Sequence, residues 1–211
     1  MSTRLLYVMD PMCSWCWGFS PVAEALVEQA GAAGVPLHLV VGGLRTGSGA
    51  ALEPTTKRYI LEHWQAVHEA TGQTFRFEGA LPDGFVYDTA PACRAIVAAR
   101  SLAPDVAWRL VKEIQQAFYL HGRDVTHGSV LAELAEKAGL PRIEFAEAFD
   151  SVEQHTATAS DFSWVQDLGI AGFPTMLAER NGQLALLTNG YQPLEVLGPL
   201  LGRWLERNAS A

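Results

Sequence analysis

The cysteine pair Cys13 and Cys16 lies between two short apolar runs, and this arrangement constrains the fold more than any other feature of the chain. Residues 4–9 are rich in branched and aromatic side chains, and a proline follows soon after them, as at the end of a buried strand. Residues 19–30 carry apolar side chains at helical spacing. Residues 36–41 form a second, largely apolar run, which is typical of a strand in a parallel sheet. The opening therefore predicts a βαβ unit whose helix begins at the cysteine pair.

The remainder of the chain divides into a helical stretch and a closing unit of mixed structure. Residues 54–160 show helical periodicity throughout and no convincing strand. The closing unit is predicted to contain, in order, a helix ending near Leu168-Gly169, a strand from Thr175, an Asn181-Gly182 hairpin turn, a strand through residues 184–188 and a helix from about Leu194. We therefore predict an α/β fold in three segments, namely residues 1–53, a helical insertion at residues 54–160, and residues 161–211.

Composition and charge exclude several classes of protein. The 211 residues are 49% hydrophobic, which is enough for a well-packed core without metals or structural disulfides. The net charge is -8 and the 15 Lys and Arg residues are scattered, so we expect no nucleic-acid partner. The apolar run at residues 5–9 is too short for a signal peptide, and no run approaches the roughly 20 residues that span a bilayer. We expect a cytoplasmic protein that does not associate with membranes, and the sequence does not indicate its oligomeric state.

The position of Cys13 favours a reactive thiolate. At the start of a helix, unpaired backbone N–H groups and the positive end of the helix dipole stabilise an anion. Helix N-termini and CxxC motifs are also the surroundings in which cysteine thiols ionise most readily. Cys16 follows three residues later on the same helical face, where it is turned inward and shielded. We therefore predict that Cys13 is the nucleophile and Cys16 the resolving thiol of a disulfide-exchange reaction.

Two other roles for the cysteine pair fit its spacing less well. A bridge across two residues closes a very short loop, so it adds little stability and is labile, as catalytic bridges are. A zinc site needs four ligands, and the pair supplies two. Cys93 and the dispersed histidines complete such a site only in principle, because His63 and His68 are five residues apart and there is no second CxxC. We expect no metal.

Several ordered motifs resemble those of one known family. They occupy residues 10–18, 88–94, 122–140 and 169–175. The first resembles the DPxCxWCxxG opening of DsbA-like oxidoreductases of the thioredoxin superfamily, in particular their FrnE-like, cytoplasmic-type members. The middle two resemble the helical insertion of that group, and the last is similar to its cis-proline segment. The resemblance runs through most of the chain and is far more specific than CxxC alone.

The resemblance implies a thioredoxin fold in which a helical domain separates the N-terminal βαβ unit from the C-terminal αββα unit. It also implies a cis Pro174 that faces the cysteine pair, and a backbone at Phe173 that pairs with an extended substrate polypeptide. Thr175 belongs to the same segment and is expected to contact substrate. Trp15 and Trp17 flank the exposed end of the helix, so they are expected to rim a hydrophobic groove.

The chain departs from the family pattern at two places. Where many members have histidine, this chain has Cys93, which lies on an apolar helical face and is expected to be a buried structural thiol. Where the best-studied periplasmic enzymes have Pro-His between the cysteines, this chain has Ser14-Trp15. A donor that would hold the thiolate is thus missing, and strong oxidising power is not expected.

Other polar residues near the motifs have more than one interpretation. Asp10 precedes the pair, where it either accepts a proton from Cys16 or caps the turn. His121, Arg123 and His127 cluster in one predicted loop, which we interpret as a solvated connection between helices.

The residues and the resemblance together predict a thiol–disulfide oxidoreductase or isomerase that acts on polypeptides or small thiols. It needs no cofactor beyond its own redox-active disulfide, with glutathione as a candidate co-substrate. One alternative is a glutathione-dependent isomerase or transferase of the related kappa-type branch, in which a serine usually replaces the first cysteine; the intact Cys13 and Cys16 speak against it. The other is a partner-binding module without enzymatic activity.

Overall fold

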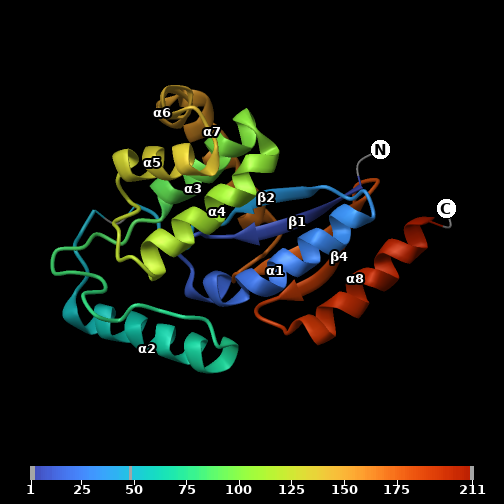
Figure 1. Ribbon diagram of the computed structural model, residues 1–211, viewed down its shortest axis with the longest axis horizontal. Helices are drawn as coiled ribbons and strands as arrows, with labels where there is room; N and C mark the ends of the chain where they lie inside the picture. The colour runs from blue at the N-terminus through green and yellow to red at the C-terminus, as the bar shows by residue number, and fades with distance from the viewer. Residues whose placement is uncertain (1–2, 48, 210–211) are drawn as a thin grey trace.

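The computed structural model describes residues 3–47 and 49–209 (Figure 1). The helices and strands follow one another in the order β1 (Thr3–Met9), α1 (Ser14–Ala32), β2 (Leu37–Val41), α2 (Pro54–Thr71), α3 (Ala90–Leu102), α4 (Pro104–Tyr119), α5 (Gly128–Ala138), α6 (Arg142–Asp150), α7 (Val152–Asp167), β3 (Thr175–Arg180), β4 (Gln183–Asn189) and α8 (Leu194–Ala209). This order confirms the predicted α/β class, with a βαβ opening, a run of helices and a closing ββα unit.

The four strands form one sheet in the order β2-β1-β3-β4. β1 runs parallel to β2, with Val8 opposite Val40, as a βαβ unit requires. β3 is antiparallel to both β1 and β4. The turn between β3 and β4 places Asn181 at φ 52° and Gly182 at φ 80°, and such a pair of positive φ angles matches the right-handed twist of a hairpin. The hairpin predicted from the Asn-Gly dipeptide is therefore present.

β1 is buried on both faces of the sheet. Its successive side chains point to opposite faces, and helices cover each of these. On one face Tyr7 packs against Phe19 of α1, with ring centroids 5.9 Å apart. On the other face Val8 forms a small apolar cluster with Val40 of β2 and Val165 of α7. This double burial explains why the sequence of β1 is continuously apolar instead of alternating.

The helices form two groups around the sheet. α1 and α8 pack against each other, whereas α3 to α7 gather together and reach the sheet chiefly through β2 (Figure 1). α2 packs against α1 and lies apart from the second group in this view. Among the described residues, no helix combines the length and the apolar character that crossing a membrane would demand.

An ion pair covers the outer edge of β2. The Arg100 guanidinium of α3 donates to the Asp161 carboxylate of α7 at 2.8 Å and also to the carbonyl of Leu39. The same carboxylate accepts the Val41 N–H at 3.0 Å. These contacts satisfy backbone groups that an edge strand would otherwise expose to another chain.

The prediction that all of residues 54–160 are helical is wrong for residues 72–89, which form no helix. Gly72, at φ 72°, ends α2 in the left-handed conformation, and an irregular segment follows up to α3. Its aromatic side chains pack on α2 and α4; Phe75, for example, lies 5.5 Å from the ring of Trp64 and 5.3 Å from that of Tyr119. Burial of aromatic rings thus stabilises this segment without regular backbone pairing.

The boundary expected at residue 160 falls inside α7. The helix predicted to open the closing unit is the second half of this longer helix. The helical insertion therefore joins the C-terminal unit within one continuous helix and not through a linker.

Candidate active site

Cys13 occupies the N-cap position of α1, as its place in the sequence predicts. Its backbone is extended (φ -83°, ψ 120°), and its carbonyl accepts the Trp17 N–H at 3.0 Å. Its own N–H donates to the carbonyl of Asp10, also at 3.0 Å, which closes the turn between β1 and α1. The orphan N–H groups of the first helical turn therefore lie beside the cysteine, where they can donate to an anion.

Cys16 lies in the interior, one turn further along α1. Its side chain is fully buried, whereas that of Cys13 keeps 5% exposure, and both are free thiols. Burial raises the pKa of the Cys16 thiol well above its usual value, and the neighbouring Cys13 raises it further. Cys16 therefore holds its proton, and Cys13 is the more exposed of the two thiols.

The segment before β3 lies against Cys13. The Phe173-Pro174 peptide bond is cis, as predicted, and the carbonyl of Phe173 is 3.7 Å from the Cys13 Sγ. The Thr175 hydroxyl donates to the Gly172 carbonyl at 2.9 Å and so holds this segment at the start of β3. Residues 160 positions apart in the sequence thus form one site.

Gly42, just after β2, makes room for the Phe173 ring. A Cβ atom at this glycine would lie 2.0 Å from the Cζ of Phe173, which no packed structure tolerates. The Gly42 N–H also donates to the Met9 carbonyl at 2.8 Å, so its backbone cannot easily retreat. The position of Phe173 next to Cys13 therefore depends on glycine at residue 42.

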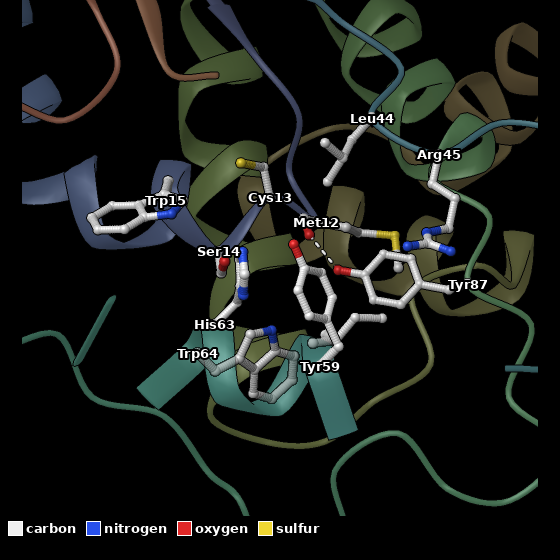
Figure 2. Close-up of a pocket in the computed structure, with 11 residues that line it drawn as sticks. Met12, Cys13, Ser14, Trp15, Leu44, Arg45, Tyr59, His63, Trp64 and Tyr87 are labelled. Atoms are coloured by element: carbon white, nitrogen blue, oxygen red, sulfur yellow. Dashed lines mark hydrogen bonds between the residues drawn. The ribbon is translucent and has the colours of Figure 1, made fainter. Parts of the chain in front are cut away.

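A cavity of about 210 Å³ opens beside Cys13 (Figure 2). It is lined by Met12, Cys13, Ser14, Trp15, Leu44, Arg45, Tyr59, Ile60, His63, Trp64 and Tyr87. A second cavity, of about 290 Å³, is lined by Trp15, Ala70, Phe173, Gly190 and Tyr191. Trp15 belongs to both cavities, which agrees with its predicted place at the rim of the site.

Trp17 and Thr175, which were expected to contact substrate, are both buried and bonded within the protein. Trp17 is only 6% exposed, stacks on Tyr119 with ring centroids 5.8 Å apart, and donates its indole N–H to the Thr74 carbonyl. It lies two residues beyond Trp15 and therefore on a different helical face, directed inward. The Thr175 hydroxyl bonds within the protein, so its role in the site is to hold the Phe173-Pro174 segment.

The carboxylate of Asp10 joins three segments behind the cysteine pair. It accepts the Met12 N–H at 2.8 Å and the Leu44 N–H at 2.7 Å, and Cys93 of α3 lies 3.3 Å away. Burial raises the pKa of this carboxyl above its usual value, although the hydrogen bonds that it accepts oppose the shift. This geometry fits the turn-capping interpretation of Asp10. The contacts of Leu44 and Cys93 come from distant segments and had no local sequence signal.

The polar cluster predicted at residues 121–127 lies outside the site. Arg123 pairs with Glu133, and His127 lies 3.1 Å from Asp124. Both pairs are substantially exposed, which agrees with a solvated loop. Over the described parts of the chain, no three His, Cys, Asp or Glu side chains gather as metal ligands would.

Comparison with known proteins agrees with this geometry. A model of the DSBA-like thioredoxin domain matches residues 4–201, so the chain belongs to the DsbA-like thioredoxin family. It is 40% identical to a candidate protein disulfide isomerase from Nitrosomonas europaea, covering 98% of this chain and 99% of that one with a TM-score of 0.89. It is 32% identical to the cytosolic disulfide reductase DsbM from Pseudomonas aeruginosa, covering 98% of each chain with a TM-score of 0.78.

Curated relatives of lower identity are ClpXP adapter proteins called SpxH. The chain is 23% identical to SpxH of Halalkalibacterium halodurans, covering 94% of this chain and 68% of that protein. It is also 23% identical to SpxH of Bacillus subtilis, covering 80% of this chain and 55% of that protein. The chain thus spans roughly half to two thirds of the length of these relatives.

Proposed function

We propose that this protein is a thiol–disulfide oxidoreductase in which Cys13 attacks and Cys16 resolves. The observation that carries the proposal is the arrangement around Cys13, whose sulfur lies at a helix N-terminus and 3.7 Å from the Phe173 carbonyl. The Cys13 thiolate attacks a substrate disulfide, which forms a mixed disulfide and releases one substrate thiolate. Cys16 then loses its proton and attacks the Cys13 sulfur, which releases the second thiolate and leaves the pair oxidised.

The two cavities suit different parts of a substrate. The cavity that includes Phe173 has the backbone of this residue beside it, where an extended polypeptide could add main-chain hydrogen bonds. The cavity on the other side of Trp15 is smaller and closed by aromatic side chains, so it suits a small thiol. The structure of DsbM with glutathione, a 30% identical neighbour, supports small thiols as substrates, and the cytosolic assignment of DsbM supports a cytoplasmic setting here.

Asp10 has two candidate roles in this mechanism. Its hydrogen bonds to Met12 and Leu44 make it a positioning residue for the loop before Cys13. A role as proton acceptor for Cys16 is the second. Asp10→Asn separates them, since asparagine keeps one acceptor oxygen but cannot take up a proton at neutral pH. Loss of the alkaline or acidic limb of the pH–rate profile would indicate proton transfer, whereas a uniform decrease would indicate positioning.

Trapping of the mixed disulfide tests the assignment of the two cysteines. Cys16→Ser in its reduced form should accumulate a covalent adduct at Cys13 with a peptide disulfide or with oxidised glutathione, seen as an added mass. Cys13→Ser should form no adduct and should neither reduce insulin nor oxidise a reduced peptide. Turnover by Cys13→Ser with no trapping by Cys16→Ser would contradict the assignment.

The same assays separate the alternatives. A glutathione-dependent isomerase or transferase would turn over a chlorinated aromatic acceptor without exchanging disulfides. A partner-binding module would catalyse neither reaction. The adapter proteins among the relatives make this last outcome worth measuring, but the free thiols of Cys13 and Cys16, the first of which lines a cavity, favour exchange.

A further inference from the structure

We propose that Arg45 binds a carboxylate of the substrate, so that the cavity beside Cys13 selects small acidic disulfides over neutral and cationic ones. Arg45 and Cys13 both line this cavity (Figure 2). The inference rests on the proposed function, because the cavity holds a disulfide only if Cys13 exchanges one.

The charge of the cavity differs from that of the whole protein. The chain carries a net charge of -8, yet none of the residues that line the cavity is Asp or Glu. Arg45 contributes a permanent positive charge to the wall. Within residues 3–47 and 49–209, no carboxylate forms an ion pair with its guanidinium. Its donors are thus available to a carboxylate that enters from solvent.

The surroundings of Arg45 fix its position relative to the nucleophile. Its carbonyl accepts the Thr89 N–H at 2.8 Å, and its N–H donates to the Thr89 hydroxyl at 3.3 Å. Its guanidinium lies 5.5 Å from the centre of the Tyr87 ring, within the range of a cation–π contact. The Tyr87 hydroxyl in turn donates to the carbonyl of Met12, the residue before Cys13 (Figure 2). A charge held in this way is preorganised for one substrate geometry.

The size of the cavity favours a small substrate. Its volume of about 210 Å³ is below the roughly 300–1,000 Å³ of sites for drug-sized ligands. The wall is otherwise largely apolar and aromatic, with Tyr59 and His63, two exposed residues of α2, at its outer side. Such a cavity admits a short arm that ends in a carboxylate and holds its carbon atoms against aromatic rings. A folded acidic polypeptide would not enter it.

The exchange reaction places this arm on the half of the substrate that stays bound. The Cys13 thiolate attacks the sulfur that carries the arm held by Arg45, and the other half leaves as a thiolate. Cys16 loses its proton through solvent to the thiolate that has left, and its sulfur attacks the Cys13 sulfur, which breaks the mixed disulfide and releases the bound half as a second thiolate. Two electrons pass from the dithiol to the substrate disulfide, so a single turnover of the reduced protein needs no other reductant.

Three symmetrical disulfides of different charge test the proposal. They are 3,3′-dithiodipropionate, which is anionic, bis(2-hydroxyethyl) disulfide, which is neutral, and cystamine, which is cationic. The fully reduced protein is mixed with each at low ionic strength, and the second-order rate of thiol loss is divided by the rate of the same disulfide with dithiothreitol. After this correction, we expect the anionic disulfide to react about 10-fold faster than the neutral one and the cationic one to react slowest.

Arg45→Gln should reduce the ratio of the anionic to the neutral rate about 10-fold, and Arg45→Lys should keep part of it, since lysine retains the charge but not the fork of donors. Arg58→Gln is the matched control, because Arg58 is exposed on α2, does not line the cavity and carries the same charge. Its ratio should stay within about twofold of wild type, because a charge outside the cavity makes no direct hydrogen bond to the bound carboxylate.

The possible outcomes distinguish a failure of the Arg45 assignment from a failure of the proposed thiol exchange. If wild type reacts with all three disulfides without charge preference, or if Arg45→Gln slows all three equally, the assignment of Arg45 is wrong while thiol exchange stands. If Arg58→Gln changes the ratio as much as Arg45→Gln, the preference comes from overall charge and the assignment is also wrong. If reduced wild type reacts with none of the three, the proposed function fails and this inference fails with it.

Discussion

The thiol of Cys93 donates a hydrogen bond to the carboxylate of Asp10, with 3.3 Å between Sγ and Oδ2, and both side chains are fully buried. The burial of Cys93 agrees with the structural thiol expected from its apolar helical face, but its partner is a charged group of the loop before Cys13. Burial and the nearby carboxylate raise the pKa of Cys93 well above its usual value, so the thiol keeps its proton and remains a donor.

Removing the Cys93 donor should destabilise the protein more than replacing the thiol with another hydrogen-bond donor. Cys93→Val is somewhat bulkier and leaves a buried carboxylate with one hydrogen bond fewer, and we expect a loss of about 1–3 kcal/mol in the free energy of unfolding. Cys93→Ser supplies a hydroxyl donor and should cost less than about 1 kcal/mol. Urea denaturation of both variants measures the difference. Equal stabilities of Cys93→Val and wild type would show that the contact contributes nothing.

Gly42→Ala should impair exchange through Phe173. The added methyl group overlaps the Phe173 ring, so the ring must shift, and we expect this shift to disturb the Phe173 carbonyl next to Cys13. We expect about a 10-fold slower reaction with peptide disulfides and a stability loss of about 1–3 kcal/mol. Gly31→Ala is the control, because no atom lies within 4 Å of its Cβ and the site is helical. If both variants react at the wild-type rate, Phe173 tolerates displacement and its position is not required.

Stability should decrease as the pH falls, because of His38. Its pKa is lowered from 6.5 to about 4, chiefly by burial and then by Arg100 and Arg4, while Asp161 and Glu179 oppose the shift. Between these values the unfolded chain binds a proton that the folded chain does not, so acid favours unfolding. The urea midpoint of wild type should therefore fall further between about pH 7.5 and about pH 5 than that of His38→Gln. Parallel decreases would assign the pH dependence to other groups.

The cysteine pair should be a moderate oxidant. Ser14 and Trp15 place no cation between the cysteines, so no charged side chain of the motif itself favours the reduced form of the pair. We expect a reduction potential of about -160 to -250 mV, between the strong periplasmic oxidants and thioredoxin. Equilibration with glutathione buffers, followed by alkylation of free thiols, measures it. A potential above about -130 mV would instead indicate a dedicated oxidase.

Much of the fold and part of the site were predictable from sequence because they depend on neighbouring residues. The βαβ opening follows from two apolar runs around a periodic helix, and the position of Cys13 at the start of that helix follows with it. The hairpin at Asn181 and Gly182 follows from a dipeptide that accepts positive φ angles. These are local preferences, and the tertiary structure did not override them.

The rest was decided only by packing between distant segments. No periodicity indicates that Gly42 must be small for the Phe173 ring, or that Arg45 lies on the same cavity as Cys13. Residues 72–89 lack a regular backbone because aromatic burial against α2 and α4 stabilises them, an energy that no local pattern reports. Trp17 turns inward although its neighbour Trp15 lines the cavity, because the helix rotates their side chains apart and α4 covers one of them. The local sequence placed Cys13 at the start of its helix, and only the folded chain brought its surroundings to it.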